Sequence, residues 1–593
     1  MDDRINEYNM FLNQDQKELT AVKKRIRILS ILRFLSFSGT FVSVIFLPRV
    51  SVHLTWSLAM ILFSLFLLFV KIFVQKEKEK KFLERLIKIE QDEVLALNEV
   101  YEQFDQGAEF SESGHAYTFD LDIFEKGGLF QFLNRTSTAE GKKRLATLLS
   151  TPEEDKTTLL QKQEAVNELA QIVRWRNFFA ARASEAQLQK SPGEITMNGK
   201  IDNPSAFLFL IRVFPALNLL LLFGAALSIL PWTFSFFSVL TSMLLLFIHR
   251  KKTDSFYTLF GKQAKILESY MHLFRMIERQ EFRSELLNSH KNKLRYGEKN
   301  ASEIIGNLQK ILSRLEYRNN LVFALIAEFL FLWDLQCIYW LDKWNCKYRK
   351  EAGAWFRIIA EMDALSSLAN MNYNNQEWAM PVFEDKEFCF QVKDLSHPLI
   401  KEKKRIGNDF CMTGPGKIVI ITGANMSGKS TFLRAIGVNM ILAMNGCRVC
   451  ASEMILKPSG IFTNMRTTDN LHKDESYFFA ELLRLQQMLA LIRQGKQPLI
   501  LIDEMLKGTN SEDKLNGSKA LVKQLFQLNA NGIVATHDLK LTELATTYPG
   551  HIFNQCFNIT LNDDNLIFDY KLQAGVTKTM NASFLMKKMG ITA

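Results

Sequence analysis

A glycine-rich segment carries the clearest chemistry in this sequence. It follows a β-branched run at residues 417–421, and a helical pattern begins near Phe432. Gly-x-x-x-x-Gly-Lys-Ser between a strand and a helix is typical of a phosphate-binding loop, whose backbone N–H groups face phosphate oxygens. In such a loop Lys429 supplies positive charge to the β- and γ-phosphates, and the Ser430 hydroxyl can ligate Mg²⁺. We therefore predict ATP and Mg²⁺ as cofactors, with this binding segment: Gly423, Ala424, Asn425, Met426, Ser427, Gly428, Lys429, Ser430 and Thr431.

Two adjacent carboxylates follow a second apolar run. Residues 499–502 read Leu-Ile-Leu-Ile, and Asp503 and Glu504 come directly after them. At the end of a buried strand, Asp503 can hold Mg²⁺ through water, and Glu504 can orient and deprotonate the attacking water. The alternative is a strand end with two solvated acids. Because a phosphate-binding loop precedes the pair, we predict Asp503 as a metal ligand and Glu504 as a catalytic residue.

A histidine follows a third apolar run. Residues 532–535 read Gly-Ile-Val-Ala and lead into Thr536, His537 and Asp538. A histidine at the end of a strand beside the catalytic one can contact the γ-phosphate or the attacking water. A structural role is the alternative for any single histidine. We predict a catalytic role for His537.

Two strongly apolar blocks indicate membrane helices. The first has apolar arms at residues 34–47 and 54–70, and the second has arms at 213–230 and 232–248. Each arm approaches the length that crosses a hydrocarbon core. The first block is not typical of a cleaved signal peptide, because a second apolar arm follows the first. We predict two transmembrane hairpins; the alternative is a pair of buried hairpins in a soluble core.

Basic residues flank both hairpins on the side of the phosphate-binding loop. Lysines and arginines cluster at residues 23–27, 71–81 and 250–252. Positive charge collects on the cytoplasmic side of a membrane. We therefore predict a multi-pass protein of the cytoplasmic (inner) membrane, with its ATPase domain and both chain ends in the cytosol. A third apolar stretch, 321–341, contains Glu328 and Asp334, so we predict a buried or membrane-apposed helix rather than a span.

Overall composition excludes several classes of protein. With 593 residues, 47% apolar and 23% charged, the chain is neither disordered, nor collagen-like, nor a small disulfide scaffold. Residues 251–350 hold 18 Lys/Arg and 11 Asp/Glu. Such a basic region suits DNA or an anionic lipid surface, and a solvated helical face is the alternative. Cys447 and Cys450 form a C-x-x-C without a partner pair, so we predict core cysteines rather than a zinc site.

The motifs together resemble the MutS family of ABC-type ATPases. GANMSGKST, LIDEMLKGTNSED and ATH resemble the family's three nucleotide motifs, and residues 121–141 and 361–369 resemble parts of its core. The resemblance covers about residues 119–200 and 355–593. It implies a homodimer through the ATPase domains, with Ser476 in a segment that reaches the partner's nucleotide, so Ser476 is a further catalytic candidate. It also implies DNA as a ligand and mismatch repair as the process.

The departures from the family define the expected architecture. A membrane hairpin and a charged helix occupy the place of the family's mismatch-reading and connector domains, so direct mismatch reading is not expected. We predict a multidomain α and α/β chain with two transmembrane hairpins, an α-helical core and lever region, and a C-terminal ABC-type P-loop ATPase domain. The predicted parts are an N-terminal helix 1–27, hairpin 28–74, charged helical linker 75–118, core start 119–204, hairpin 205–249, helical lever and core region 250–380 and ATPase domain 381–593.

These predictions define a membrane-anchored MutS-like ATPase that binds and hydrolyses ATP in a dimer and contacts DNA through its basic helical region. One alternative is an ATP-driven membrane remodelling or signalling device that does not bind DNA. A second alternative, an ABC-type transporter subunit, fits poorly because two hairpins do not suit a transport pathway.

Overall fold

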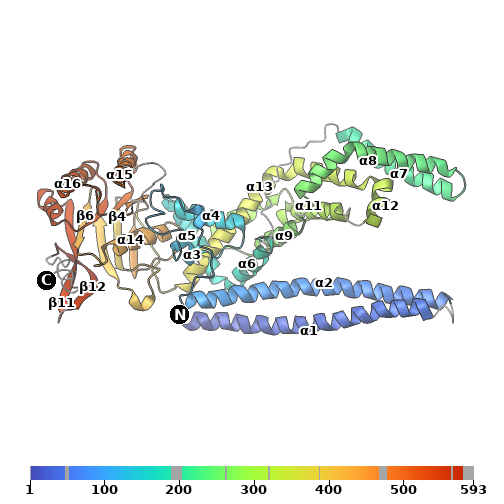
Figure 1. Ribbon diagram of the computed structural model, residues 1–593, viewed down its shortest axis with the longest axis horizontal. Helices are drawn as coiled ribbons and strands as arrows, with labels where there is room; N and C mark the ends of the chain where they lie inside the picture. Colours follow the sequence, from blue (N-terminus) through green and yellow to red (C-terminus); the bar gives the residue numbers. More distant parts are fainter. Residues whose placement is uncertain are drawn as a thin grey trace.

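Helices make up most of the described chain, and its larger β-sheets lie at one end. The computed structural model describes the following residues: 2–46, 52–187, 204–260, 264–317, 321–385, 387–466, 477–562 and 565–577. The molecule is elongated, with the α/β part at one end and the far ends of two helical hairpins at the other (Figure 1). The N-terminus lies at the base of the first hairpin, next to the helical core.

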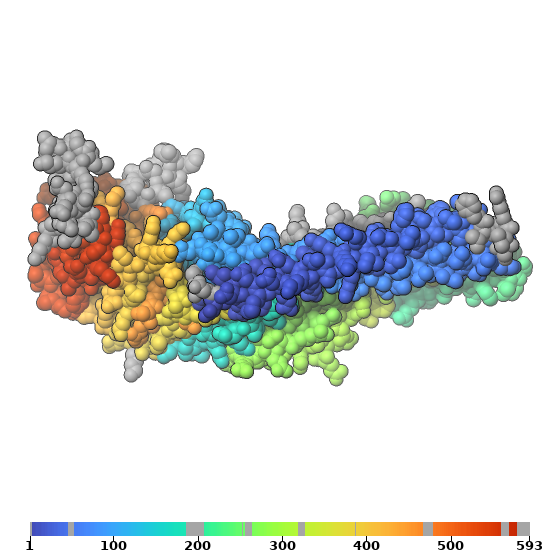
Figure 2. Space-filling model, turned by 90° about the horizontal axis from the view of Figure 1, so that it is seen from below, coloured from blue at the N-terminus to red at the C-terminus, as the bar shows by residue number. Residues whose placement is uncertain are grey.

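Two long helices, α1 (Asp2–Phe46) and α2 (Val52–Leu97), form the first hairpin. They run side by side along the molecule, and Figure 2 shows α1 over much of its length. The predicted N-terminal helix and first apolar arm are therefore one continuous helix, and the second arm continues into the predicted charged linker. The outer halves of both helices expose large apolar side chains, and Phe34, Trp56 and Met60 are 68%, 63% and 70% exposed.

Polar contacts fix the base of this hairpin to the helical core. The Tyr8 hydroxyl donates a hydrogen bond to the side chain of Asn370 (3.3 Å). Arg174 bridges the buried carboxylates of Asp15 and Glu90. Burial raises the pKa of Glu90 to about 8, and the neighbouring Asp15 carboxylate adds to this shift. The hairpin is thus anchored at its base, while its apolar outer half faces away from the core.

The centre of the described chain is a helical core built around one long helix, α13 (Trp333–Asn374). Its 42 residues extend about 63 Å at the rise of an α-helix. The other elements of this region are η2 (Ala108–Phe110), α3 (Leu129–Leu133), α4 (Ala139–Ser150), α5 (Lys156–Gln171), α6 (Val173–Gln187), α9 (Ala264–Arg279), α10 (Glu285–Lys293), β1 (Arg295–Tyr296), β2 (Lys299–Asn300) and α11 (Ala301–Glu316).

A buried carboxylate ties α13 to the start of α4. Asp363 accepts hydrogen bonds from the backbone N–H groups of Ser137 (3.1 Å) and Thr138 (2.8 Å), at the N-terminus of α4. A side chain at Gly141 is excluded, because its Cβ would lie 2.2 Å from an Asp363 oxygen. Burial raises the pKa of Asp363 to about 6, and the hydrogen bonds from Thr138 and Ser137 oppose this shift. The contact fixes the position of α13 against α4.

The second hairpin consists of α7 (Pro204–Ala226) and α8 (Trp232–Phe260), and the short helix α12 (Leu321–Phe331) packs against it. Four described helices, α1, α2, α7 and α8, contain segments long and apolar enough to cross a membrane. Those segments are only 6–17% buried. The stretch 321–341, predicted as one helix, is instead divided at Leu332, whose φ of 51° ends α12 and lets α13 begin.

Two sheets form the α/β part. The larger sheet has the order β12 (Asn565–Ala574), β11 (Ile552–Asn562), β6 (Ile418–Gly423), β10 (Gly532–Thr536), β9 (Leu499–Asp503), β8 (Ile461–Asn464). All neighbours in it pair in parallel except β11 and β12. The smaller sheet has the order β3 (Val382–Phe383), β7 (Glu453–Leu456), β4 (Cys389–Leu395), β5 (Asn408–Thr413). The remaining elements are η4 (Glu402–Lys404), α14 (Lys429–Ala443), α15 (Tyr477–Arg493), α16 (Ser511–Gln527), η5 (Leu539–Glu543) and α17 (Leu544–Thr547).

A short segment before α3 joins the helical core to the α/β part. Asp120 accepts hydrogen bonds from the Thr463 hydroxyl (2.7 Å) and from Arg484 (3.1 Å). Leu121 packs so closely on α14 that a Cβ at Gly437 would lie 2.7 Å from it. The described chain is therefore mostly helical with mixed sheets, as predicted at this level. The membrane role of the hairpins and the predicted domain boundaries stay predictions.

Candidate phosphate-binding site

The glycine-rich loop connects β6, buried along its whole length, to α14. Gly428 has a φ of 105°, a conformation that favours glycine, and a Cβ there would lie 3.1 Å from the Tyr570 ring. At Gly423 a Cβ would lie 2.7 Å from the Ser427 hydroxyl oxygen. The two glycines of the motif are thus required by the loop itself, and they leave its backbone open to a ligand.

Lys429 begins α14 and turns back into the loop. Its ammonium group donates hydrogen bonds to the carbonyl oxygens of Gly423 (2.7 Å) and Ala424 (2.9 Å). Burial lowers the pKa of Lys429, while Asp503 and Glu504 act in the opposite direction. The buried Ser427 hydroxyl has no hydrogen-bond partner among the described residues. Positive charge and an unpartnered donor in one loop fit the oxygens of a phosphate group.

The sheet brings the predicted metal ligands together. β10 lies between β6 and β9, so Asp503 at the end of β9 reaches across to the first turn of α14. There the Ser430 hydroxyl donates a hydrogen bond to the Asp503 carboxylate. A hydroxyl and a carboxylate form an oxygen donor set of the kind that Mg²⁺ prefers. The two residues therefore fit a magnesium ion next to the phosphate loop.

Glu504 and His537 also lie side by side, as predicted for neighbouring strands. The His537 Nδ1 atom is 3.0 Å from a carboxylate oxygen of Glu504, and the Lys507 ammonium is 3.9 Å from the other oxygen. Burial raises the pKa of Glu504, but the hydrogen bond and charge of His537 and the charge of Lys507 outweigh it. The pKa is therefore lowered overall. Glu504 also has a φ of 56°, and its N–H donates to the carbonyl of Ala535 (2.9 Å).

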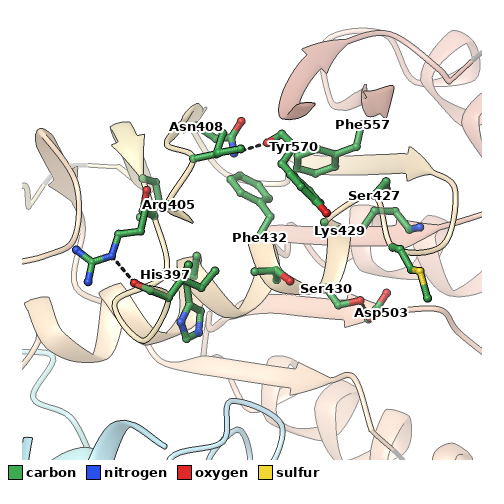
Figure 3. Close-up of a pocket in the computed structure, with 18 of the residues that line it drawn as sticks. His397, Arg405, Asn408, Ser427, Lys429, Ser430, Phe432, Asp503, Phe557 and Tyr570 are labelled. Carbon is green, nitrogen blue, oxygen red and sulfur yellow. Dashed lines mark hydrogen bonds between the residues drawn. The ribbon is translucent and has the colours of Figure 1, made fainter. Parts of the chain in front are cut away.

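A cavity of about 510 Å³ extends from the loop to a second wall that the sequence did not predict. Figure 3 shows His397 and Arg405 on one side of this cavity and Ser427 and Lys429 on the other. Burial, followed by the charges of Arg434 and Arg405, lowers the pKa of His397 to about 4, so this side chain is neutral at physiological pH. Residues 396–398, Ser-His-Pro, also resemble part of the MutS family's core, and this resemblance was the signal available for the second wall.

One aromatic and one amide side chain complete the second wall, those of Tyr570 and Asn408. Tyr570, from β12, has a φ of 52°, and its carbonyl accepts a hydrogen bond from the Asn408 side chain (3.0 Å). Both residues line the cavity together with Ile406. The cavity thus combines a polar, cationic end with a wall of aromatic and apolar groups, which suits a molecule with a phosphate tail and a flat ring.

One predicted site residue lies outside the described residues. Ser476 immediately precedes α15, whose first described residue is Tyr477. The rest of that motif is tied to the site, because the buried Glu481 accepts hydrogen bonds from the N–H groups of Leu506 (2.5 Å) and Lys507 (3.2 Å). Through Glu481, the helix α15 that follows Ser476 in the chain is therefore tied to the loop after β9.

The two cysteines of the C-x-x-C lie in the core, as predicted. Cys447 and Cys450 are both buried, and burial raises the pKa of each thiol to about 12. Among the residues that the structure describes, no cluster of histidine, cysteine and carboxylate side chains could hold a metal ion of the zinc type.

The loop between β6 and α14 and the carboxylates at the end of β9 lie together at one edge of the larger sheet. Residues 419–588 match the family model described as MutS domain V. One similar curated protein is the DNA mismatch repair protein MutS of Thermotoga maritima. It is 32% identical over 238 residues, which are 39% of this chain and 29% of that protein. MutS of Bacillus cytotoxicus is 32% identical over 225 residues, 37% of this chain and 25% of that protein. MutS protein homolog 4 of Homo sapiens is 31% identical over 233 residues, 38% of this chain and 24% of that protein.

The chain is similar to the MutS family over residues 419–588. It spans less than a third of the length of these curated relatives, and the similarity falls on the part that carries the phosphate loop, Asp503, Glu504 and His537. The helical hairpins lie outside the matched family model.

Proposed function

We propose that this chain is a membrane-anchored ATPase that binds and hydrolyses ATP with Mg²⁺ as a dimer and couples this cycle to DNA. The observation that carries the proposal is the convergence of Lys429, Ser430, Asp503 and Glu504 at the C-terminal ends of the parallel strands β6 and β9. These residues supply a phosphate counter-charge, two oxygen ligands for Mg²⁺ and a carboxylate next to a histidine.

Each residue has a distinct role in the proposed reaction. Lys429 exchanges its two carbonyl contacts for phosphate oxygens. Ser430 and Asp503 would hold Mg²⁺, which would supply positive charge next to the phosphates. Glu504 accepts a proton from the attacking water. His537 orients the Glu504 carboxylate and keeps it ionised. The wall formed by His397, Ile406 and Tyr570 holds the base and ribose end of the nucleotide.

The dimer is proposed from the family resemblance. In this arrangement Ser476 of one subunit completes the nucleotide site of the other. The test mixes a Ser476→Ala subunit with a Lys429→Ala subunit, because one intact composite site then forms in the mixed dimer. Hydrolysis above that of either variant alone is expected, and its absence would remove support for a shared site.

Membrane anchoring is proposed from the four long apolar helices. Their candidate spans are 6–17% buried, although they carry many large apolar side chains. Both hairpins extend toward the same end of the molecule, opposite the α/β part (Figure 1). If the membrane plane is perpendicular to the long axis of the molecule, one bilayer can therefore contain both hairpins while the nucleotide site remains in the cytosol. Extraction of native membranes with alkaline carbonate tests this, since release of the full chain would contradict it.

DNA is proposed as a ligand because the similar proteins of Thermotoga maritima and Bacillus cytotoxicus are DNA mismatch repair proteins. The excess of basic residues in 251–350 supports phosphate contacts. Fluorescence anisotropy with duplex DNA over a salt series is the experiment. Binding that weakens steeply with salt is expected, and no binding at low salt would contradict a DNA role.

A second candidate function is an ATP-driven membrane device that does not bind DNA. One contact favours it. Glu99, just after α2, accepts a hydrogen bond from the N–H of Glu402 (2.7 Å). Glu402 begins the η4 turn, and Lys404 and Arg405 at the end of this turn line the nucleotide cavity. The first hairpin is therefore linked to the nucleotide site directly, without any DNA-binding element between them.

A further inference from the structure

A short apolar helix beside the second hairpin has no part in the nucleotide chemistry. α12 has 11 residues, and Glu328 is the one ionisable residue in its sequence. As an α-helix it extends about 16 Å, half of a hydrocarbon core of about 30 Å. We propose that α12 inserts into the cytosolic leaflet without crossing the bilayer, and that an exposed stripe of α13, Trp340, Lys343 and Lys347, binds anionic phospholipid headgroups. The inference rests on the membrane anchoring proposed above.

Asn218 of α7 holds the C-terminal end of α12. Its side-chain amide donates hydrogen bonds to the carbonyl oxygens of Phe329 (3.1 Å) and Leu330 (3.2 Å), and its oxygen accepts one from the Ser238 hydroxyl. The helix ends here because Leu332 is left-handed, so its last carbonyl groups lack helical partners. Such groups are costly in hydrocarbon unless protein satisfies them. Asn218 provides that partner within an apolar hairpin.

Arg212 gives the depth of this contact. Arg212 is exposed and precedes Asn218 by six residues, or about 9 Å along α7. A charged side chain on a lipid-facing helix lies at the edge of the hydrocarbon, so the end of α12 lies about 9 Å inside that edge. α13 begins at this depth and runs back toward the cytosol, so Trp340 lies about 10 Å along the α13 axis from its first residue. Trp340 is therefore level with Arg212.

The exposed stripe continues from this level toward the cytosol. Trp340, Lys343 and Lys347 are spaced three and four residues apart, so they share one face of α13. All three are exposed, and the Lys343 ammonium lies 5.7 Å from the centre of the Trp340 ring. Within the described ranges, no carboxylate forms an ion pair with either lysine, and Glu351 lies one turn farther from the hairpin. Tryptophan favours the membrane interface, and lysines next to it attract anionic headgroups.

The first test measures the depth of α12 in the full chain, reconstituted in lipid nanodiscs. An environment-sensitive dye is attached to Ile326→Cys, a position that is 56% exposed, after Cys346, Cys389 and Cys411 are replaced by serine. The remaining cysteines are buried. The matched control is the dye at Glu303→Cys on α11. Brominated acyl chains are expected to quench the dye at Ile326→Cys and not at the control, and aqueous iodide is expected to do the opposite. Iodide quenching at Ile326→Cys equal to the control would overturn the insertion of α12.

The second test measures headgroup binding. The detergent-solubilised full chain is titrated with fluorescent phosphatidylglycerol and, separately, with fluorescent phosphatidylcholine. The pair Lys343→Gln and Lys347→Gln is expected to weaken binding of phosphatidylglycerol by about thirty-fold and leave phosphatidylcholine unchanged, because each lysine near an anionic surface changes affinity about fivefold. The control pair, Lys496→Gln and Lys523→Gln, removes the same charge from the exposed surface of the α/β part. Equal loss in both pairs, or no loss in either, would overturn the headgroup site.

The outcomes separate this inference from the membrane proposal. If alkaline carbonate releases the native chain, membrane anchoring itself is wrong, and α12 has no bilayer to enter. If the chain resists extraction while the dye at Ile326→Cys is open to iodide, anchoring stands and only the insertion of α12 is wrong.

Discussion

Replacement of Glu504 with glutamine tests the proton-accepting role in the proposed hydrolysis. Glutamine keeps the size of the side chain and an oxygen that can still face Nδ1 of His537, which lies 3.0 Å from the carboxylate. It cannot accept a proton. Because the pKa of Glu504 is lowered, the wild-type carboxylate is ionised at neutral pH and ready to act. Loss of such a base costs about 10²–10⁴ in rate, or about 3–5 kcal/mol in the barrier.

Nucleotide binding should change little in this variant, since the contacts of Lys429 and the Ser430–Asp503 pair do not involve Glu504. Single-turnover hydrolysis of radiolabelled ATP measures the chemical step, and titration with a fluorescent ATP analogue measures affinity. The matched control is Glu512→Gln, an exposed acid in the first turn of α16. Hydrolysis in Glu504→Gln within about twofold of the control would refute a base role, because it falls far short of the smallest expected loss.

Two further predictions follow from the same site, and a third concerns DNA. Lys429→Ala should weaken nucleotide binding as well as hydrolysis, since the phosphates lose their buried counter-charge, and the same fluorescent titration checks it. His537→Ala removes a cause of the lowered pKa of Glu504; the carboxylate is active above its pKa, so the fall in rate on acidification should move to higher pH in a pH–rate profile. Competition binding with matched and mismatched duplexes should show less than about 1 kcal/mol of preference for the mismatch, below the 1–3 kcal/mol typical of base reading; a tenfold preference would contradict this.

The nucleotide motifs were predictable because their chemistry is local. The two glycines, Lys429 and Ser430 lie within eight residues, and each is needed for the turn or for the first turn of the helix that follows. The opposite wall was not predictable in the same way. His397, Tyr570 and the loop reach one cavity from three distant segments, and only the strand order places β12 and β6 near each other through β11.

Two helix boundaries differ in how far the sequence could have predicted them. The linker predicted after residue 74 rested on a change from apolar to charged residues, yet residues 52–97 contain neither glycine nor proline, so the continuous helix α2 could have been predicted. The break at Leu332 has no such signal, because glycine and proline are also absent from residues 321–352. The carbonyl groups of Phe329 and Leu330, just before the break, accept hydrogen bonds from Asn218, more than a hundred residues earlier in the chain. The break therefore depends on tertiary structure.

The contact between Glu99 and Glu402 is too weak to drive the hairpin alone. An exposed hydrogen bond contributes about 1 kcal/mol, which changes an equilibrium about fivefold. To shift a two-state conformational equilibrium from about 1:99 to about 99:1 requires about 5.5 kcal/mol. The rest must come from contacts that move with the same elements. Asn374, at the end of α13, donates to the buried carboxylate of Glu93 in α2 (2.9 Å), and Asp363 joins α13 to α4. A nucleotide-driven motion therefore has to carry the first hairpin and α13 together, because the buried contact between Asn374 and Glu93 would break if either moved separately.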